Sequence, residues 1–450
     1  MDDAPGMKIP HRVHMVGAGG IGMSALAQML VSRGHVVSGS DRCESPTTML
    51  LEKKGIRVTI GHGNVPEGTE LLIYSDAVWP DNPERSQTAY LKIPEMSYFE
   101  ALGEISNGMR TVAVAGTHGK TTTTGMVAKI LVDAGAKPSA VIGSIVRDFE
   151  SNYVQGESDL FVAPSSAKAT AGKGGLFVVE ACEYRDHLLE LSSEILVITN
   201  VELDHTDFFP TLAAMQETFR KAAEAVPKHG AIITNPQGPN MAPVLQNVQA
   251  RLIDYTQMAI GSLQLPGEFN KENARAALAA ARVAMPTLSL EAGVKSLSQF
   301  KGSWRRFEYK GETESGALIY DDYAHHPTAV QKTIVAAREK FPDKKIVVAF
   351  HPHLYSRTRD LMEGFSSALA TADEVILAPI FEARERPIEG VTSEVLAEKI
   401  AELGTPVQAF KSLHDIFLHL TKPDTLVAND LLLTMGAGDI YKVAEEIVSE

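Results

Sequence analysis

The sequence contains little cysteine and no excess of positive charge. Its 450 residues include only two cysteines, Cys43 and Cys182, which do not suggest a disulfide framework or a metal-thiolate cluster. Lysine and arginine number 42 against 56 aspartates and glutamates, a net charge of −14, so the overall field does not attract nucleic acid or an anionic membrane. No stretch has the apolar length of a membrane span, and the N-terminus lacks the basic and apolar parts of a signal peptide. We therefore expect a cytoplasmic protein without nucleic-acid or membrane partners.

The sequence does contain a repeated alternation of strand-like apolar runs and helix-like segments, which is typical of parallel α/β sheets. A chain of this length is too long for one ordinary domain, and the alternation falls into three blocks. We predict three α/β domains in series, at residues 1–107, 108–300 and 301–450, and a polar loop at 165–174. The expected strands are Arg12–Val16, Val36–Ser38, Val58–Ile60, Leu71–Tyr74, Thr111–Ala115, Gly175–Val179, Ile195–Thr199, Ala231–Thr234, Leu318–Asp321, Ile346–Phe350, Glu374–Ala378 and Leu431–Met435.

The strongest chemical signal is a glycine-rich turn between a predicted strand and a predicted helix. It reads Gly116-Thr117-His118-Gly119-Lys120-Thr121-Thr122. Backbone amides of such a turn, with the helix N-terminus behind them, form a cradle for phosphate oxygens. Lys120 would reach the terminal phosphates of ATP, and the Thr121 hydroxyl would hold Mg²⁺. The general P-loop pattern has a glycine where this chain has Val114, and the alternative interpretation is a simple turn with an exposed lysine.

A second glycine turn, Gly17-Ala18-Gly19-Gly20-Ile21-Gly22, follows the first strand, and Asp41 comes after the next one. The spacing matches a dinucleotide fingerprint. It requires only a close approach of the backbone to a pyrophosphate at a helix N-terminus. The turn therefore suits NAD, FAD or a UDP-sugar equally well.

Polar residues follow two further strands of the second block. Glu180 ends one strand, and Asn200 and the run Val201–His205 follow another. Strand ends in a parallel sheet converge on the crevice where ligands bind. An acid and a histidine there could hold Mg²⁺ near a nucleotide. Taken singly, each residue would be assigned a surface or capping role.

The last block concentrates histidine. Four of the 14 histidines lie in two short turns, within Tyr320–Thr328 and His351–Thr358. A metal cluster is disfavoured because the adjacent His325 and His326 cannot easily point at one ion. We expect contacts with a charged substrate, and buried histidines in hydrogen bonds are the alternative.

With these motifs in place, the chain resembles the Mur ligases over nearly its whole length and in the order of that family. The resemblance rests on His14–Ser24, Gly116–Thr123, Glu180–Tyr184, Thr199–His205, Pro266–Ala274, Trp304–Glu308, Asp321–Thr328, His351–Thr358 and Gly436–Ile440. It implies an N-terminal Rossmann-like domain for a UDP-sugar, a central P-loop ATPase-like domain and a C-terminal Rossmann-like domain for an amino acid. The implied substrates are ATP, UDP-N-acetylmuramate and L-alanine, with Mg²⁺.

The resemblance also assigns residues to roles. Lys120, Glu180 and His205 would be catalytic, and Thr121, Glu180 and His205 would hold the metal. The nucleotide would lie against the turn Gly116–Thr122 and against Asn270, Asn273, Arg306 and Asp321. The UDP-sugar would lie against Gly17, Gly19, Gly20, Gly22, Asp41 and His118, and the acceptor against Tyr323, His325, His353 and Arg357.

The reaction implied by the resemblance passes through an acyl phosphate. The lactyl carboxylate of the sugar attacks the γ-phosphate of ATP, and the amine of the acceptor then displaces phosphate. Activation is needed because a carboxylate is a poor electrophile until one of its oxygens becomes a good leaving group.

Some positions depart from the family pattern. Leu354 stands where an arginine is common, so Arg357 or a neighbour such as Arg384 must bind more of the acceptor carboxylate. Phe269 replaces a histidine, and the short segment between Thr234 and Pro266 suggests that peripheral strands are missing. Alternative functions are a ligase that recycles a tripeptide, a nucleotide-binding oxidoreductase, and a P-loop switch protein without ligase activity.

Overall fold

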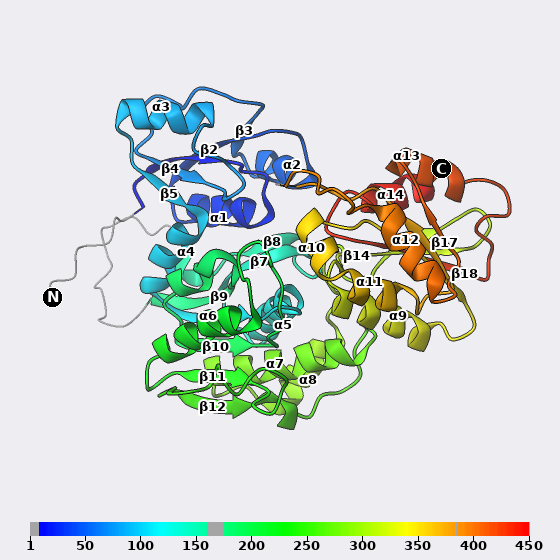
Figure 1. Cartoon of the computed structure of the whole chain (residues 1–450). Coiled ribbons are helices and arrows are strands. Elements are labelled where there is room, and N and C mark those ends of the chain that lie inside the picture. The colour runs from blue at the N-terminus through cyan, green and yellow to red at the C-terminus, as the bar shows by residue number, and fades with distance from the viewer. Residues whose placement is uncertain (1–8, 160–173, 384, 450) are drawn as a thin grey trace. The chain divides into compact units, whose positions relative to one another are not determined.

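The structure is a computed structural model of the chain and describes residues 9–159, 174–383 and 385–449. Three sheets follow one another along the sequence, with helices between their strands (Figure 1). The three α/β domains predicted from the sequence are therefore present. The predicted polar loop lies, up to residue 173, outside the described residues, and so does Arg384.

The first sheet is parallel throughout and has the strand order β3-β2-β1-β4-β5. The strand order reverses at β1, and ligands of such sheets bind at that point, beyond the carboxyl ends of the strands. Its elements are β1 Arg12–Val16, α1 Ile21–Ser32, β2 Val36–Asp41, α2 Pro46–Lys53, β3 Arg57–Ile60, β4 Leu71–Tyr74, α3 Pro83–Leu91, β5 Glu95–Ser97 and α4 Tyr98–Asn107.

The second sheet has the order β12-β11-β10-β6-β9-β7-β8 and is parallel except for β8, which runs antiparallel to β7. The short segment after Thr234 was expected from the sequence to lack peripheral strands. This segment nevertheless contains one edge strand of the sheet, β12. The elements are β6 Met109–Ala115, α5 Lys120–Asp133, β7 Ser139–Val146, β8 Ser151–Val154, η1 Glu157–Asp159, β9 Gly174–Glu180, η2 Tyr184–Glu190, β10 Ile195–Ile198, α6 Leu212–Ala225, β11 Ala231–Thr234, β12 Arg251–Asp254, η3 Tyr255–Gln257, α7 Glu268–Ala284 and α8 Leu290–Ser298.

The third sheet has the order β13-β14-β18-β15-β16-β17, and only β13 runs antiparallel to its neighbour. Its elements are β13 Glu308–Glu312, β14 Leu318–Asp322, α9 Pro327–Lys340, β15 Lys345–Phe350, α10 Tyr355–Asp360, α11 Met362–Leu369, β16 Glu374–Leu377, α12 Ser393–Glu402, β17 Val407–Ala409, α13 Leu413–Leu420, β18 Asp430–Met435 and α14 Tyr441–Ser449.

The central strands of the third sheet, β14, β18, β15 and β16, have buried side chains on both faces. In β15, Ile346, Val348 and Phe350 belong to one apolar cluster, whereas Val347 and Ala349 belong to another. Successive side chains of a strand point to opposite faces, so each cluster is the core beneath one layer of helices. Helices α9, α11 and α12 cover the first face, and α13 and α14 cover the second.

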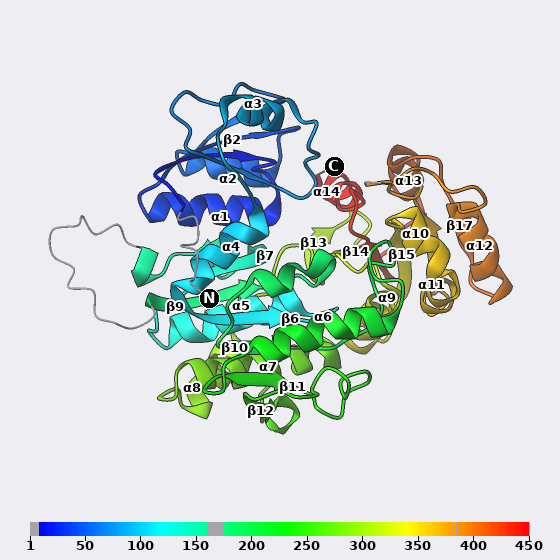
Figure 2. The same ribbon diagram turned by 60° about the vertical axis from the view of Figure 1, so that its left-hand side comes forward.

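The chain forms two compact units. The first contains the first two sheets and comprises the chain up to Val201 with Met215–Ser262 and Glu272–Phe300, and the second contains Glu202–Ala214, Leu263–Lys271 and the chain from Lys301. Within the first unit, α1 lies between the first sheet and strands β7 and β8, as Figures 1 and 2 show. Among the described residues, no helix is long and apolar enough to cross a membrane.

Candidate active site

The glycine turn of the first domain joins β1 to α1 and is closely packed. Gly17 has φ +78°, and a Cβ on Gly22 would lie 2.6 Å from the ring of Tyr98. The Asp41 carboxylate accepts a hydrogen bond of 2.8 Å from the backbone N–H of Gly19. Gly20 is the residue immediately before the first turn of α1. The structure thus brings the predicted glycines and Asp41 together, and Asp41 orders the turn itself.

The turn between β6 and α5 has two glycines in the left-handed region. Gly116 has φ +129° and Gly119 has φ +83°. A Cβ on Gly116 would lie 2.1 Å from the Thr199 hydroxyl oxygen, and one on Gly119 would lie 2.2 Å from the Asn273 amide oxygen. The backbone approaches its neighbours so closely that side chains cannot fit at these two positions.

We expect Gly116→Ala to destabilise the protein and remove nucleotide binding, because the new methyl group collides with Thr199 at a backbone conformation that alanine avoids. Gly135→Ala is the matched control. Gly135 also has a positive φ, +80°, but no atom lies within 4 Å of its added Cβ. The control should cost only the conformational strain, about 1–2 kcal/mol. Thermal unfolding and nucleotide titration compare the variants, and equal effects would contradict the close-packed turn.

Lys120 is held against its own turn by a buried acid that the sequence analysis did not single out. Its Nζ donates to the carbonyl oxygens of Gly116 at 2.6 Å and Thr117 at 3.2 Å, and to the two Glu183 oxygens at 3.0 and 2.9 Å. Glu183 is only 1% exposed. Burial alone would lower the pKa of Lys120, but the Glu183 carboxylate reverses this and raises it. The lysine is therefore charged and placed at the phosphate cradle.

Thr121 and Glu180 bring two oxygen ligands together beside this lysine. The Thr121 hydroxyl donates to Glu180 Oε1 at 3.1 Å, and Glu180 Oε2 accepts from the Gly143 N–H at 2.9 Å. Hydroxyl and carboxylate oxygens are ligands that Mg²⁺ prefers. These two predicted metal ligands fit the ion. The third, His205, belongs to the second compact unit and has φ +52°.

The end of β10 fixes the shape of the P-loop. Asn200 accepts from the N–H of His118 at 2.9 Å and donates to its carbonyl oxygen at 3.1 Å. Thr199 donates to that same carbonyl oxygen at 2.6 Å, and the N–H of Thr117 donates to the Asn200 carbonyl at 3.1 Å. Asn200 and Thr199 therefore hold the backbone of the turn in place, a role that the motif alone did not assign.

In the second unit, the four predicted acceptor residues lie together. The rings of Tyr323 and His325 are 5.1 Å apart, those of His325 and His353 are 6.2 Å apart, and Arg357 Nη1 is 3.1 Å from His353 Nδ1. Leu354 is 1% exposed with φ +70°, so this departure from the family buries an apolar side chain beside the cluster.

Asp204 is the countercharge of this cluster, and the sequence analysis did not single it out. Its Oδ1 accepts from Arg357 Nε at 2.9 Å and lies 2.8 Å from Arg357 Nη2. Burial would raise the pKa of Asp204, but Arg357 holds it well below its usual range. Burial, together with Arg357, lowers the pKa of His325 well below its usual range, so His325 is neutral at pH 7.

The residues predicted around the nucleotide are found in different environments. Asp321 is fully buried, accepts from Arg305 Nε at 2.8 Å and from Thr434 at 2.7 Å, and is thereby part of the core of the second unit. The Arg306 guanidinium lies 4.9 Å from the ring centroid of Tyr323, and Asn270 donates to the Pro266 carbonyl at 2.7 Å. Asn273 belongs to the first unit, and its amide oxygen is the atom that a Cβ on Gly119 would meet first.

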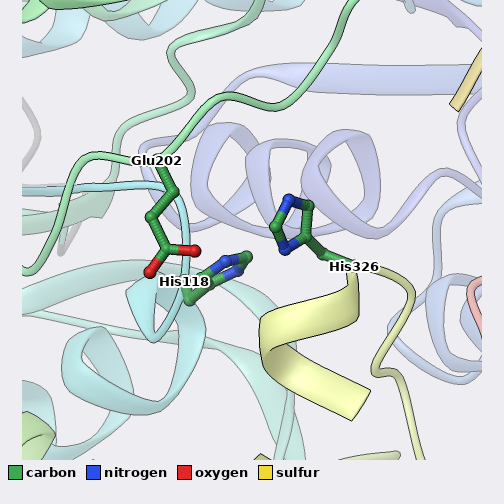
Figure 3. A group of neighbouring side chains, drawn as sticks. All are labelled: His118, Glu202 and His326. Carbon is green, nitrogen blue, oxygen red and sulfur yellow. The ribbon is translucent and has the colours of Figure 1, made fainter. Parts of the chain in front are cut away.

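Glu202 and His326 form a further polar group in the second unit (Figure 3). Glu202 Oε2 accepts from the Thr328 hydroxyl at 2.7 Å. His326 caps α9 by accepting from the Thr328 N–H at 3.3 Å, and its Nε2 lies 3.2 Å from the Leu203 carbonyl oxygen. The segment after β10 is thus tied to the start of α9 by hydrogen bonds.

Comparisons with known proteins agree with this arrangement. Three family profiles match in order: "Mur ligase family, catalytic domain" at residues 12–110, "Mur ligase middle domain" at 114–261 and "Mur ligase, glutamate ligase domain" at 305–438. A UDP-N-acetylmuramate–L-alanine ligase of Salinibacter ruber is 36% identical over 97% of this chain and 94% of its own. A ligase of the same name from Desulfitobacterium hafniense is 37% identical over 98% of this chain and 100% of its own.

Solved structures show the same fold. The UDP-N-acetylmuramate–alanine ligase of Thermotoga maritima has a TM-score of 0.78 at 25% identity, covering 97% of this chain and 98% of its own. A murein peptide ligase of Psychrobacter arcticus has a TM-score of 0.70 at 24% identity, covering 98% of both chains.

Proposed function

Because the chain belongs to the Mur ligase family, we propose that it joins L-alanine to the lactyl carboxylate of UDP-N-acetylmuramate at the expense of ATP, in the synthesis of peptidoglycan precursors. The observation that carries the proposal is the full-length similarity to ligases of that name. The P-loop lysine, the paired oxygen ligands and the histidine–arginine cluster supply groups for each part of this reaction.

We assign donor binding to the first domain. The glycine turn between β1 and α1 presents backbone N–H groups and a helix N-terminus to a pyrophosphate, and Asp41 keeps the turn in shape. His118, on the P-loop, is assigned to the muramyl end of the donor. The boundaries proposed for the donor, ATP and acceptor domains are residues 1–107, 108–300 and 301–450.

We assign ATP and Mg²⁺ to the second domain. Residues Gly116–Thr122 would surround the phosphates, and Lys120 would move from Glu183 to the γ-phosphate. Thr121 and Glu180 would hold Mg²⁺, which neutralises charge that develops on the transferring phosphoryl group. We propose that His205 holds the metal and that Asn270, Asn273 and Arg306 bind the nucleotide. Asp321 is fully buried in its pair with Arg305, so we do not propose that it contacts the nucleotide.

We assign acceptor binding to the cluster of the third domain. The Nδ1 of His325 lies 2.8 Å from the Tyr323 carbonyl, to which it donates, so Nε2 has a lone pair that can accept from the acceptor's ammonium group. Arg357 is the cation for the acceptor carboxylate, and its pair with Asp204 holds the guanidinium in place. Leu354 adds no charge, which suits a small apolar amino acid.

The test of the acceptor is the rate of phosphate release with UDP-N-acetylmuramate, ATP and a panel of acceptors. We expect L-alanine to be the best, with glycine and L-serine about 10- to 200-fold weaker, because one methylene or hydroxyl group discriminates by about 1–3 kcal/mol. The tripeptide L-alanyl-γ-D-glutamyl-diaminopimelate should not support turnover. If it were the only good acceptor, the chain would be a recycling ligase and the proposal would be wrong.

A further inference from the structure

A contact between a histidine and an aspartate joins the first two domains of the chain at the edge of the donor turn. His187, in η2 of the second domain, contacts the carboxylate of Asp76, which follows β4 of the first domain, through Nε2 and Oδ2. The His187 ring also stacks on Phe99 with 3.7 Å between centroids and 10° between planes. Both side chains are largely buried, at 13% and 23% exposed.

Asp76 belongs to a segment, residues 75–82, that we call the donor loop because it packs on the glycine turn. The N–H of Ser75 donates to the Val16 carbonyl at 3.1 Å. A Cβ on Gly17 would lie 3.0 Å from the Ser75 Cβ and 3.2 Å from a Val78 methyl group. Arg85 donates to the Val78 carbonyl at 3.0 Å. A displacement of Asp76 would therefore change the wall of the donor turn.

His187 is connected to the nucleotide turn by only a few residues. Glu183, four positions earlier, forms the ion pair with Lys120. Between them, Arg185 and Asp186 have φ of +53° and +62°. Two successive non-glycine residues in the left-handed region are strained, and such strain is concentrated at active sites, ligand clamps and switch regions.

We propose that the His187–Asp76 pair couples occupancy of the nucleotide site to the donor loop. Phosphate oxygens that bind Lys120 compete with Glu183 for its ammonium group. Release of Glu183 lets the strained segment relax, and His187 then carries the change to Asp76. This inference rests on the proposed function, because it requires that nucleotide and donor bind to these two turns. Linkage makes the effect reciprocal, so each ligand changes the affinity of the other by the same factor.

Trp79 provides the signal that tests the coupling. It lies in the donor loop, is 66% exposed and is one of only two tryptophans. The other, Trp304, packs edge to face on Tyr441, and we replace it with phenylalanine, which keeps an aromatic ring at that position. In the full-length Trp304→Phe protein, UDP-N-acetylmuramate is titrated by Trp79 fluorescence, without nucleotide and with a saturating non-hydrolysable ATP analogue and Mg²⁺. We expect the donor Kd to change at least about fivefold, the lower end of the range typical of coupled sites.

His187→Gln and Asp76→Asn, made singly in that background, should reduce this change to less than about 1.5-fold while the affinity for the analogue alone stays within twofold. His229→Gln is the control, since His229 is a surface histidine of the same unit with a side chain 71% exposed, and it should retain the full change. A donor Kd that does not respond to nucleotide in the parent protein, or a response kept by both variants, would overturn the coupling alone. Absence of donor binding in the parent protein would overturn the proposed function with it.

Discussion

Lys120→Ala should lower the rate of ATP-dependent ligation by at least about a hundredfold, because one preorganised charge at the transferring group stabilises the transition state by several kcal/mol. The ammonium group of this lysine donates to the carbonyl oxygens of the P-loop, and the buried Glu183 holds it there. Phosphate release with all three substrates measures the effect. Near-normal turnover would remove the P-loop from the mechanism.

Two further variants separate this chemical loss from a loss of folding. Removing Lys120 leaves Glu183 buried without its cation, which is itself destabilising. The double variant Lys120→Ala, Glu183→Gln removes both charges and should regain stability without regaining activity. Lys137→Ala is the surface control, because its side chain is 65% exposed and its ion-pair partner, Glu157, is exposed as well. It should leave turnover unchanged.

Arg357→Met should produce the largest loss of stability. Arg357 and Asp204 are each about 4% exposed, and deleting one partner of a buried pair costs about 3–5 kcal/mol. The midpoint of thermal unfolding of the third domain should fall on the order of 10 °C. Acceptor-dependent turnover should disappear as well, because the guanidinium is our proposed contact for the acceptor carboxylate.

Neighbouring residues supply the controls for this variant. Arg359→Met, two positions along, removes a side chain that is 53% exposed and should change stability by no more than about 0.5 kcal/mol. Asp204→Asn combined with Arg357→Met should recover much of the lost stability without restoring turnover. If Arg357→Met unfolded at the same temperature as Arg359→Met, the buried ion pair between Arg357 and Asp204 would not stabilise the third domain.

The local signals in the sequence predicted most of the fold. Apolar runs bounded by turns marked β1, β4 and β11 with their observed bounds, and the glycine-rich turn that begins at Gly116 leads into a helix, α5, as predicted. Two of the strands that were not predicted, β5 and β17, have three residues each and lie at the edges of their sheets, whereas another, β7, has eight residues and lies between β9 and β8. Edge strands of this length lack the long apolar runs that identify buried strands.

Motifs in the sequence predicted the residues of the candidate site. They did not predict which acidic residues, distant in sequence, pair with its basic residues. Glu183 beside Lys120 and Asp204 beside Arg357 are separated by 63 and 153 positions. No local periodicity encodes which acid will neutralise which base, because the folded sheet order decides that. Asp321 shows the same limit, since its place at a strand end is compatible with a ligand contact and with the buried pair to Arg305 that the structure contains.

The fate of one donor oxygen tests the central claim, ATP-driven activation of a carboxylate, most directly. UDP-N-acetylmuramate labelled with ¹⁸O in its lactyl carboxylate is incubated with the enzyme, ATP, Mg²⁺ and L-alanine, and the phosphate and the UDP-sugar product are analysed by mass spectrometry. Ligation through an acyl phosphate predicts one ¹⁸O in each phosphate released and a product that carries one alanine in amide linkage. Phosphate without the label, or ATP consumption without the amide product, would contradict the account.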